Sequence, residues 1–212
     1  DHRLRIATSS GDRRYFARER MSVAAFYRKV TRALAELDIE ARIWPVPVEI
    51  PDPIQPFPEN EGQTAYDPEA VGRYWRALVQ IHRVFTEFRA RFQGKVSPVH
   101  LFWGAFDLAV TRFSGRTAPK HPGGAPNCAD WVMVEAYSHE VASAGFWPGA
   151  GLGEAAFYAY AYPEPKGFGQ YRVRPGAAYY HKGLGEFILH YEDVRTADDP
   201  DAMLLGFLQS TY

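Results

Sequence analysis

The chain has 212 residues, of which 24 are lysine or arginine and 25 are aspartate or glutamate, giving a net charge of −1. Hydrophobic residues make up 46% and charged residues 23%, which excludes a largely disordered chain, a collagen and a coiled coil. The near-zero charge argues against nucleic acid or an anionic membrane as the partner, and no apolar run is long enough to predict a transmembrane helix. The single cysteine, Cys128, allows no intrachain disulfide and indicates a reducing compartment.

The first half of the chain predicts a small strand–helix segment, a proline-rich arm and one long helix. Six prolines between 45 and 58 exclude regular structure there and predict an extended surface connector. Asp67 and Pro68 are typical of a helix start, and Gly94 of a helix end. The expected elements are strands over 3–8 and 13–17, an amphipathic helix over 23–37, a strand over 39–44 and a helix over 68–92.

The second half predicts mostly strands. A run of apolar residues over 99–113 is the longest strand candidate, and residues 155–162 alternate most regularly. The other expected elements are a loop over 115–130, a short helix from 130, a strand around 139–147, a loop over 163–176, a strand over 186–191 and a final helix from 199. With little helix between these strands, the chain is expected to be α+β, with a mostly antiparallel, aromatic-rich sheet and amphipathic helices on one face.

The pattern of a strand followed by an amphipathic helix occurs over 3–37 and again over 186–209. Within a single domain of 212 residues, we therefore consider two related halves, 1–50 and 97–212, joined by the proline-rich arm and the long helix. The alternative is a chance recurrence, since a strand followed by a helix is common. The sequence favours neither interpretation.

Asp107 is a candidate catalytic residue because an unpaired carboxylate in the middle of an apolar strand is costly. It must face solvent, an arginine or a ligand. Arg112 is a candidate for holding an anionic group of a substrate, and Trp103 shares the predicted face of Asp107. A purely structural pair of aspartate and arginine is the competing interpretation.

His139 and Glu140 are the second candidates for catalysis, since histidine and glutamate transfer protons and bind metals. Neighbours in a strand point to opposite faces, so the two could not share one site there. If the preceding helix continued, Glu135 and His139 would lie on one helical face and could hold a metal. Hydrogen bonding within the sheet is the favoured interpretation, and we assign no metal site and no cofactor.

Tyr158, Tyr160 and Tyr162 form a row on one face of a predicted strand, opposite a face of mostly alanine. The row could line a ligand pocket, with Tyr158 and Tyr160 binding substrate, or it could be core packing. His100 is one of several scattered histidines that could join such a pocket.

Four segments of the chain carry a resemblance to one protein family. They are ARIWPVPVEIP (41–51), SPVHLFWGAFDLAVTRFSGR (97–116), YSHE (137–140) and FYAY (157–160). With these segments the chain resembles a bacterial family of unknown function, domain of unknown function 5996. The resemblance implies a bacterial cytoplasmic protein and a further N-terminal segment before Asp1. It implies no activity, cofactor or catalytic residue.

Two classes of function follow from these residues. The first is a small-molecule-binding protein or enzyme whose pocket lies on the sheet around Trp103, Asp107, His139 and Tyr160, with Arg112 or Glu140 at the rim. The second is a non-catalytic module that uses aromatic faces to bind a protein partner or a second copy of itself. Convergence of at least three of the polar side chains in one concave pocket favours the first class.

Overall fold

The computed structural model describes residues 2–51 and 54–212 of the chain. The chain forms two compact units, Asp1–Trp75 and Arg76–Tyr212. No helix among the described residues has both the length and the apolar character needed to cross a membrane.

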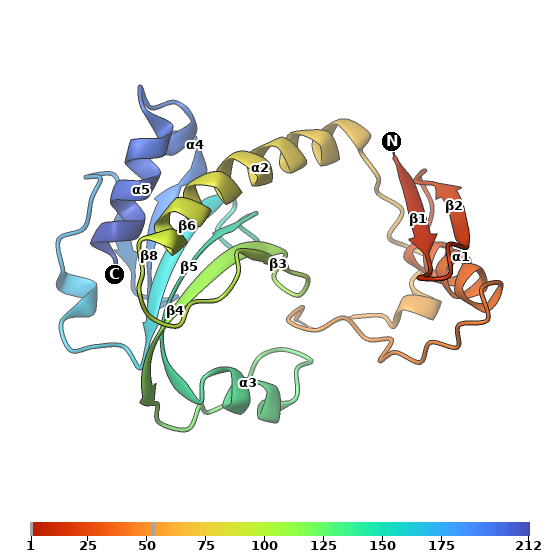
Figure 1. The fold of residues 1–212 in the computed structure, drawn as a ribbon, viewed down its shortest axis with the longest axis horizontal. Coiled ribbons are helices and arrows are strands. Elements are labelled where there is room, and N and C mark those ends of the chain that lie inside the picture. The colour runs from red at the N-terminus through yellow and green to blue at the C-terminus, as the bar shows by residue number, and fades with distance from the viewer. Residues whose placement is uncertain (1, 52–53) are drawn as a thin grey trace. The chain divides into compact units, whose positions relative to one another are not determined.

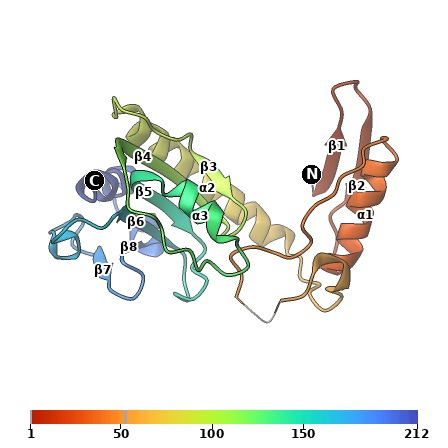
Figure 2. The same cartoon turned by 90° about the horizontal axis from the view of Figure 1, so that it is seen from below.

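The first unit is built on a β-hairpin packed against a helix. Strands β1 (Arg3–Ala7) and β2 (Arg13–Ala17) pair antiparallel, and helix α1 (Val23–Ala35) lies alongside them, as Figure 2 shows. The inward side of the hairpin carries Leu4, Ile6 and Phe16, and the Phe16 ring meets Phe26 of α1 edge-on at 5.7 Å. These elements lie where the alternation and the helical spacing predict them.

Polar contacts fix the start of α1 and hold the segment that follows it in the fold. Ser22 is the N-cap, and its Oγ accepts a hydrogen bond from the Ala25 amide at 3.0 Å. The same hydroxyl donates to Glu61, which also pairs with Arg28. A 3₁₀ turn, Phe57–Glu59, precedes this glutamate.

The predicted strand over 39–44 is wrong, because these residues form no strand. Trp44 is 72% exposed and Ile43 also faces solvent, so the alternating pattern marks no buried face. A strand needs a neighbour for its backbone hydrogen bonds, and no described strand pairs with this segment. Of the proline-rich arm, residues 52–53 lie outside the described part of the chain.

Helix α2 (Pro68–Ala90) is the predicted long helix, and it runs from the first unit into the second. Asp67 caps it by accepting hydrogen bonds from the amides of Glu69 and Ala70. Its buried residues, Ile81, Val84, Phe85 and Phe88, all belong to the second unit.

The second unit is an antiparallel sheet of six strands in the order β3-β4-β5-β6-β8-β7 (Figure 1). The strands are β3 (His100–Phe102), β4 (Asp107–Thr117), β5 (His139–Trp147), β6 (Ala156–Tyr162), β7 (Tyr179–His181) and β8 (Glu186–His190). The helical elements are α3 (Asp130–Ala136), the 3₁₀ turn Phe168–Gln170, α4 (Tyr191–Arg195) and α5 (Pro200–Ser210). The α+β class with an aromatic-rich antiparallel sheet is confirmed.

The predicted long strand over 99–113 is instead a hairpin. The chain turns over at residues 103–106, so that Leu101 pairs with Leu108 and Phe102 with Asp107. Phe106 has a φ of 61°, a conformation that its apolar side chain gives no reason to expect. The short elements β7 and α4 also escape the sequence patterns, since a strand of three residues is too short to show alternation.

The two faces of this sheet are covered by different elements. We call the face that carries α2 and α5 in Figure 1 the helix face and the opposite one the tyrosine face. On the helix face Phe146 and Phe157 meet Phe85 of α2 in an apolar core, with Leu204 and Phe207 of α5 also buried. The tyrosine face carries Asp107, Ser143, Gly145, Tyr158, Tyr160 and Glu186.

Candidate functional site

A hydrogen bond across three strands defines the centre of the tyrosine face. Tyr158 of β6 pairs with Gly145 of β5, and its hydroxyl donates to the Asp107 carboxylate at the start of β4. Gly145 makes this possible, because a Cβ at that position would overlap the Tyr158 ring. The ring therefore lies over β5, and Asp107, with only 7% of its surface exposed, has a buried partner.

Asp107 and a second carboxyl, Glu186 of β8, are both shifted toward the neutral form. Burial raises the pKa of Asp107, and the hydrogen bond from Tyr158 offsets part of that effect. Burial, followed by the neighbouring Asp107 carboxyl, raises the pKa of Glu186 to about 7. Within the part of the chain that the structure describes, no lysine or arginine forms an ion pair with either carboxyl. Glu186 is therefore a proton-exchanging group at neutral pH.

The other tyrosines of this face are held by neutral hydrogen bonds. The Tyr160 hydroxyl bonds that of Tyr137 at 2.7 Å, and the ring of His121 stacks on Tyr137 with 4.7 Å between centroids. Burial raises the pKa of both Tyr158 and Tyr160 well above the ordinary value, so both remain protonated donors. The loop and helix before β5 thus cover much of this row, and the tyrosines pack as a second, polar core.

His139 and Glu140 do not join this cluster. Phe146 pairs with Leu108, next to Asp107, and His139 lies seven residues away along β5, about 23 Å for an extended strand. His139 is exposed. Glu140 pairs with Arg116 and accepts a hydrogen bond from Ser114 at 2.8 Å, and these contacts lower its pKa.

Arg112 lies on the helix face and is only 3% exposed. Its Nη2 donates to the Phe88 carbonyl at 2.6 Å, and its guanidinium stacks over the Phe88 ring at 3.5 Å and the Tyr212 ring at 4.4 Å. Burial lowers its pKa. The expected structural pair of Arg112 with Asp107 does not form, because the two side chains lie on opposite faces of the sheet. Aromatic rings stabilise the Arg112 cation instead.

The β3–β4 hairpin carries the remaining candidates. His100 pairs with Ala109 and lies against the Phe102 ring at 4.4 Å. Trp103 is 80% exposed in the turn, with its ring 6.1 Å from that of Phe106. These open aromatic side chains are the kind that the interaction-module hypothesis requires, and that hypothesis stays a prediction.

The structure separates the two residues that could have shared a metal on one helical face. Helix α3 ends at Ala136 and His139 begins β5, so Glu135 and His139 do not lie on one helix. Among residues 2–51 and 54–212, no three histidine, cysteine, aspartate or glutamate side chains gather in a metal-binding group.

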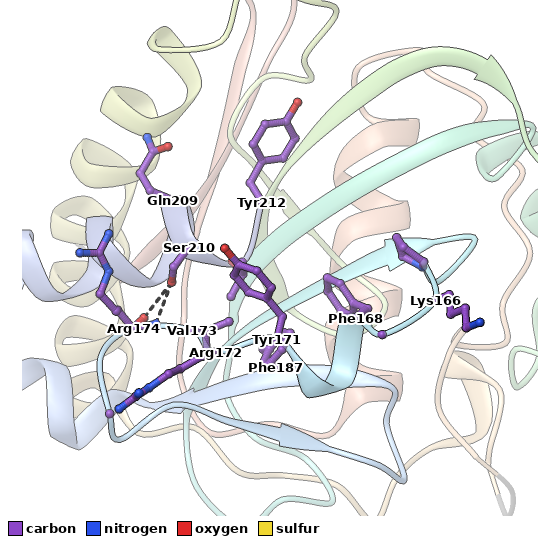
Figure 3. A pocket seen from close by; sticks show the side chains of 14 residues that line it. Lys166, Phe168, Tyr171, Arg172, Val173, Arg174, Phe187, Gln209, Ser210 and Tyr212 are labelled. Carbon is purple, nitrogen blue, oxygen red and sulfur yellow. Dashed lines mark hydrogen bonds between the residues drawn. The ribbon is translucent and has the colours of Figure 1, made fainter.

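A large cavity lies beside the start of β8, on the helix face. Its volume is about 930 Å³, and it is bounded by the loop after β6, by Phe187 and by the last residues of the chain (Figure 3). Three cations line it: Lys166, Arg172 and Arg174. No aspartate or glutamate is among the lining residues, and among the described residues none forms an ion pair with these cations.

The cavity wall is held by backbone contacts and by aromatic packing. The Arg174 amide donates to Ser210 Oγ at 2.9 Å, and that hydroxyl donates back to the Arg174 carbonyl at 3.1 Å, as the dashed lines in Figure 3 show. The Phe168 ring meets Phe187 edge-on at 5.0 Å. Gly167 has a φ of 84°, which lets the loop turn before Phe168.

The sequence contains signals for both Glu186 and the cavity, although neither was predicted. Glu186 belongs to a predicted apolar strand, and the cost of burying an unpaired carboxylate, which singles out Asp107, applies to it as well. No acidic residue stands between Glu164 and Glu186, although four lysines and arginines do. A segment that carries positive charges and no negative ones indicates an anion-binding loop.

A family model matches the whole chain. Its description is "Family of unknown function (DUF5996)", and the match covers residues 1–212. The chain belongs to this family. The resemblance drawn from the four sequence segments is thereby confirmed. No curated protein and no solved structure matches the chain, so the geometry of the second unit is the basis for a functional argument.

Proposed function

We propose that this DUF5996 protein binds a small organic anion in the cavity of its second unit. One observation carries the proposal: three cations, Lys166, Arg172 and Arg174, line a cavity of about 930 Å³ that no aspartate or glutamate side chain lines. Unneutralised cations around a concave surface concentrate anions there.

The residue types favour carboxylate or phosphate as the charged group of the ligand. Two of the three cations are arginines, whose planar guanidinium donates two parallel hydrogen bonds to either group. Figure 3 shows Arg172 and Arg174 on one side of the lining and Lys166 on the other. An anion between them would be approached from both sides.

The remaining lining favours a ligand with a planar or apolar part. Phe168, Tyr171 and Phe187 lie between the cations in Figure 3, and Tyr212 closes the wall above them. Tyr171 is largely exposed, so its ring is available for stacking. The cavity volume is within the range of small-molecule sites, which is about 300–1,000 Å³.

This proposal keeps the small-molecule class expected from the sequence and places the ligand elsewhere. The expected pocket around Trp103, Asp107, His139 and Tyr160 needs side chains that the fold distributes over two ends of the sheet. Asp107, Tyr158 and Glu186 do gather, but much of the space over them is occupied by the protein's own aromatic side chains.

Calorimetric titration with chosen probes tests the proposal. We expect phenyl phosphate to bind, inorganic phosphate to bind more weakly, and benzylamine, which carries the same ring on a cation, not to bind. Replacing both arginines, Arg172→Gln with Arg174→Gln, should weaken phenyl phosphate binding at least tenfold, because two charge-assisted hydrogen-bonding groups are lost.

The matched control is the pair Arg73→Gln and Arg76→Gln, which removes two exposed arginines of α2 and should leave binding unchanged. Unfolding midpoints of both double variants show whether the fold survives. Equal binding of benzylamine and phenyl phosphate, or unchanged binding after loss of Arg172 and Arg174, would contradict the proposal.

A further inference from the structure

The net charge of −1 hides a strong separation of charge along the chain. Residues 1–35 contain nine lysines and arginines and three aspartates and glutamates, a surplus of six positive charges. The rest of the chain contains 15 and 22, a deficit of seven. A charge asymmetry of this kind is typical of a segment that meets a polyanion.

The fold gives these nine cations different surroundings. Four make internal contacts in the first unit: Arg14 pairs with Glu36, Arg28 with Glu61 and Lys29 with Glu19, while Arg18 stacks on Phe26. Arg32 lies in the last turn of α1, where a cation is favourable, and Arg20 is exposed between β2 and α1.

The outer face of the hairpin holds three of the cations that lack such contacts. Side chains alternate along β1 and β2, so Arg3, Arg5 and Arg13 all point away from α1 and are exposed. Arg5 pairs with Tyr15, which is 53% exposed, and Arg13 pairs with Ala7. No described carboxylate forms an ion pair with any of these three arginines.

We propose that this outer face of the β1–β2 hairpin binds the phosphate backbone of a nucleic acid. Arg3 and Arg5 stand about 7 Å apart along β1, and Arg13 stands on the neighbouring strand, so three guanidinium groups share one flat surface. A ribbon of two strands fits the major groove of a duplex, and arginine donates two hydrogen bonds to phosphate.

The same surface argues against a membrane as the polyanion. Apart from Tyr15, its other outward side chains are Ala7 and Ala17, which are too small to insert among lipid chains. The large apolar side chains of the hairpin face α1. Tyr15 offers a ring on which a base can stack, a contact that a lipid headgroup does not use.

The expectation of no nucleic-acid partner rests on the charge of the whole chain. Binding depends on the local surface, because screening confines electrostatic attraction to about 8–10 Å at physiological salt. The acidic surplus therefore weakens binding at this face only where it lies within that distance. This inference is independent of the anion cavity, which belongs to the second unit.

Fluorescence anisotropy with the full chain tests the proposal, using labelled 20-mers as duplex DNA, duplex RNA and single strands. We expect micromolar dissociation constants at 50 mM NaCl for at least one of the three. The probe that binds most tightly identifies the kind of nucleic acid. The triple variant Arg3→Gln, Arg5→Gln, Arg13→Gln should bind at least tenfold more weakly. Its slope of log affinity against log salt should fall by about three for duplex DNA, since three phosphate contacts are lost.

Two controls separate this proposal from the anion cavity. The double variant Arg172→Gln, Arg174→Gln should bind nucleic acid as the unmodified protein does, and the triple hairpin variant should still bind phenyl phosphate. Because the three arginines face solvent, circular dichroism and the unfolding midpoint should be unchanged. No binding of any nucleic acid at 50 mM NaCl, an unaltered triple variant, or equal binding of poly-glutamate would overturn the proposal.

Discussion

The two faces of the six-stranded sheet are made by the same strands and are buried in different ways. On the helix face, Val110, Phe146 and Phe157 bury apolar surface against α2, where Phe85 is fully enclosed. On the tyrosine face, alternate residues of the same strands bury hydroxyl and carboxyl groups that bond one another. Stability on the first face comes from apolar area, and on the second from hydrogen bonds and protonation together with a smaller apolar cluster of Ala109, Ala156, Tyr158 and Ile188.

The two buried charged residues of the sheet illustrate the difference between its faces. Arg112 is buried on the helix face and Asp107 on the tyrosine face, so the sheet itself prevents the two from pairing. Each charge is stabilised by local means. Three aromatic rings surround the guanidinium, whereas the carboxyl accepts from Tyr158 and is shifted toward its neutral form by burial. The tyrosine face therefore depends on pH in a way that the helix face does not.

The largest effect is expected on the helix face. Phe85→Ala should lower the free energy of unfolding by about 4 kcal/mol, because it removes a fully buried ring and leaves a cavity beside Phe157. Urea denaturation measures this, and the loss should be the same at pH 5 and pH 8. Val79→Ala, on the exposed side of the same helix, is the control and should change stability by less than about 0.5 kcal/mol.

A loss that changed between the two pH values would contradict the contrast between the faces. It would mean that packing on the helix face is linked to a titrating group. The Arg112 guanidinium, which is buried on that face, keeps its proton throughout this range.

Elements with a long, regular period could be predicted from the sequence, and so could the α+β class. Helices α1 and α2 and strand β6 lie close to their expected bounds. The hairpin of β3 and β4 could not be predicted, because its turn at 103–106 contains two large aromatic residues and lacks the asparagine or aspartate followed by glycine that marks most tight turns. Apolar periodicity alone does not locate such a turn.

The candidate sites, too, could be predicted from the sequence only in part. Asp107 could be singled out because a lone carboxylate in an apolar strand needs a reason. Its partner Tyr158 lies 51 residues away, and only the strand register brings them together. The cavity could not be assembled from sequence, since its wall joins a loop at 165–176 to the residues 209–212 at the end of α5. Such contacts depend on tertiary packing and not on local pattern.

The second effect is a pH dependence that arises from Glu186. Its pKa is raised from 4.5 to about 7 in the folded protein, so the folded state binds the proton more tightly than the unfolded state. Stability is then greatest below pH 4.5 and is lost as the pH rises to about 7, by about 3 kcal/mol in total. Glu186→Gln should remove most of this loss and make the variant more stable than the unmodified protein at pH 8.

Glu140→Gln is the matched control, because Arg116 lowers the pKa of Glu140. A lowered pKa contributes stability above the ordinary value and loses it as the pH falls, so this variant should be affected in the opposite direction. Denaturation curves between pH 4 and pH 8 measure both variants. If Glu186→Gln behaved as the unmodified protein does at every pH, the buried carboxyl would have no part in the difference between the faces.

The smallest effect concerns the hydroxyl that joins β6 to β4. Tyr158→Phe leaves Asp107 buried without its donor and should cost about 2 kcal/mol at pH 7 and about 1 kcal/mol at pH 4. The cost falls at low pH because a protonated carboxyl needs the donor less than an ionised one. Tyr160→Phe removes a bond between two neutral hydroxyls and should cost about 1 kcal/mol at both pH values.

Comparing the two variants at several pH values distinguishes an effect of the Asp107 carboxyl from an effect of losing a tyrosine hydroxyl. Both substitutions keep the aromatic packing of the tyrosine face, so a change common to both reports only a lost hydroxyl. A cost of Tyr158→Phe that stayed constant from pH 4 to pH 7 would show that Asp107 does not ionise in that range. The tyrosine face would then be a neutral core, and its contrast with the helix face would reduce to hydrogen bonding alone.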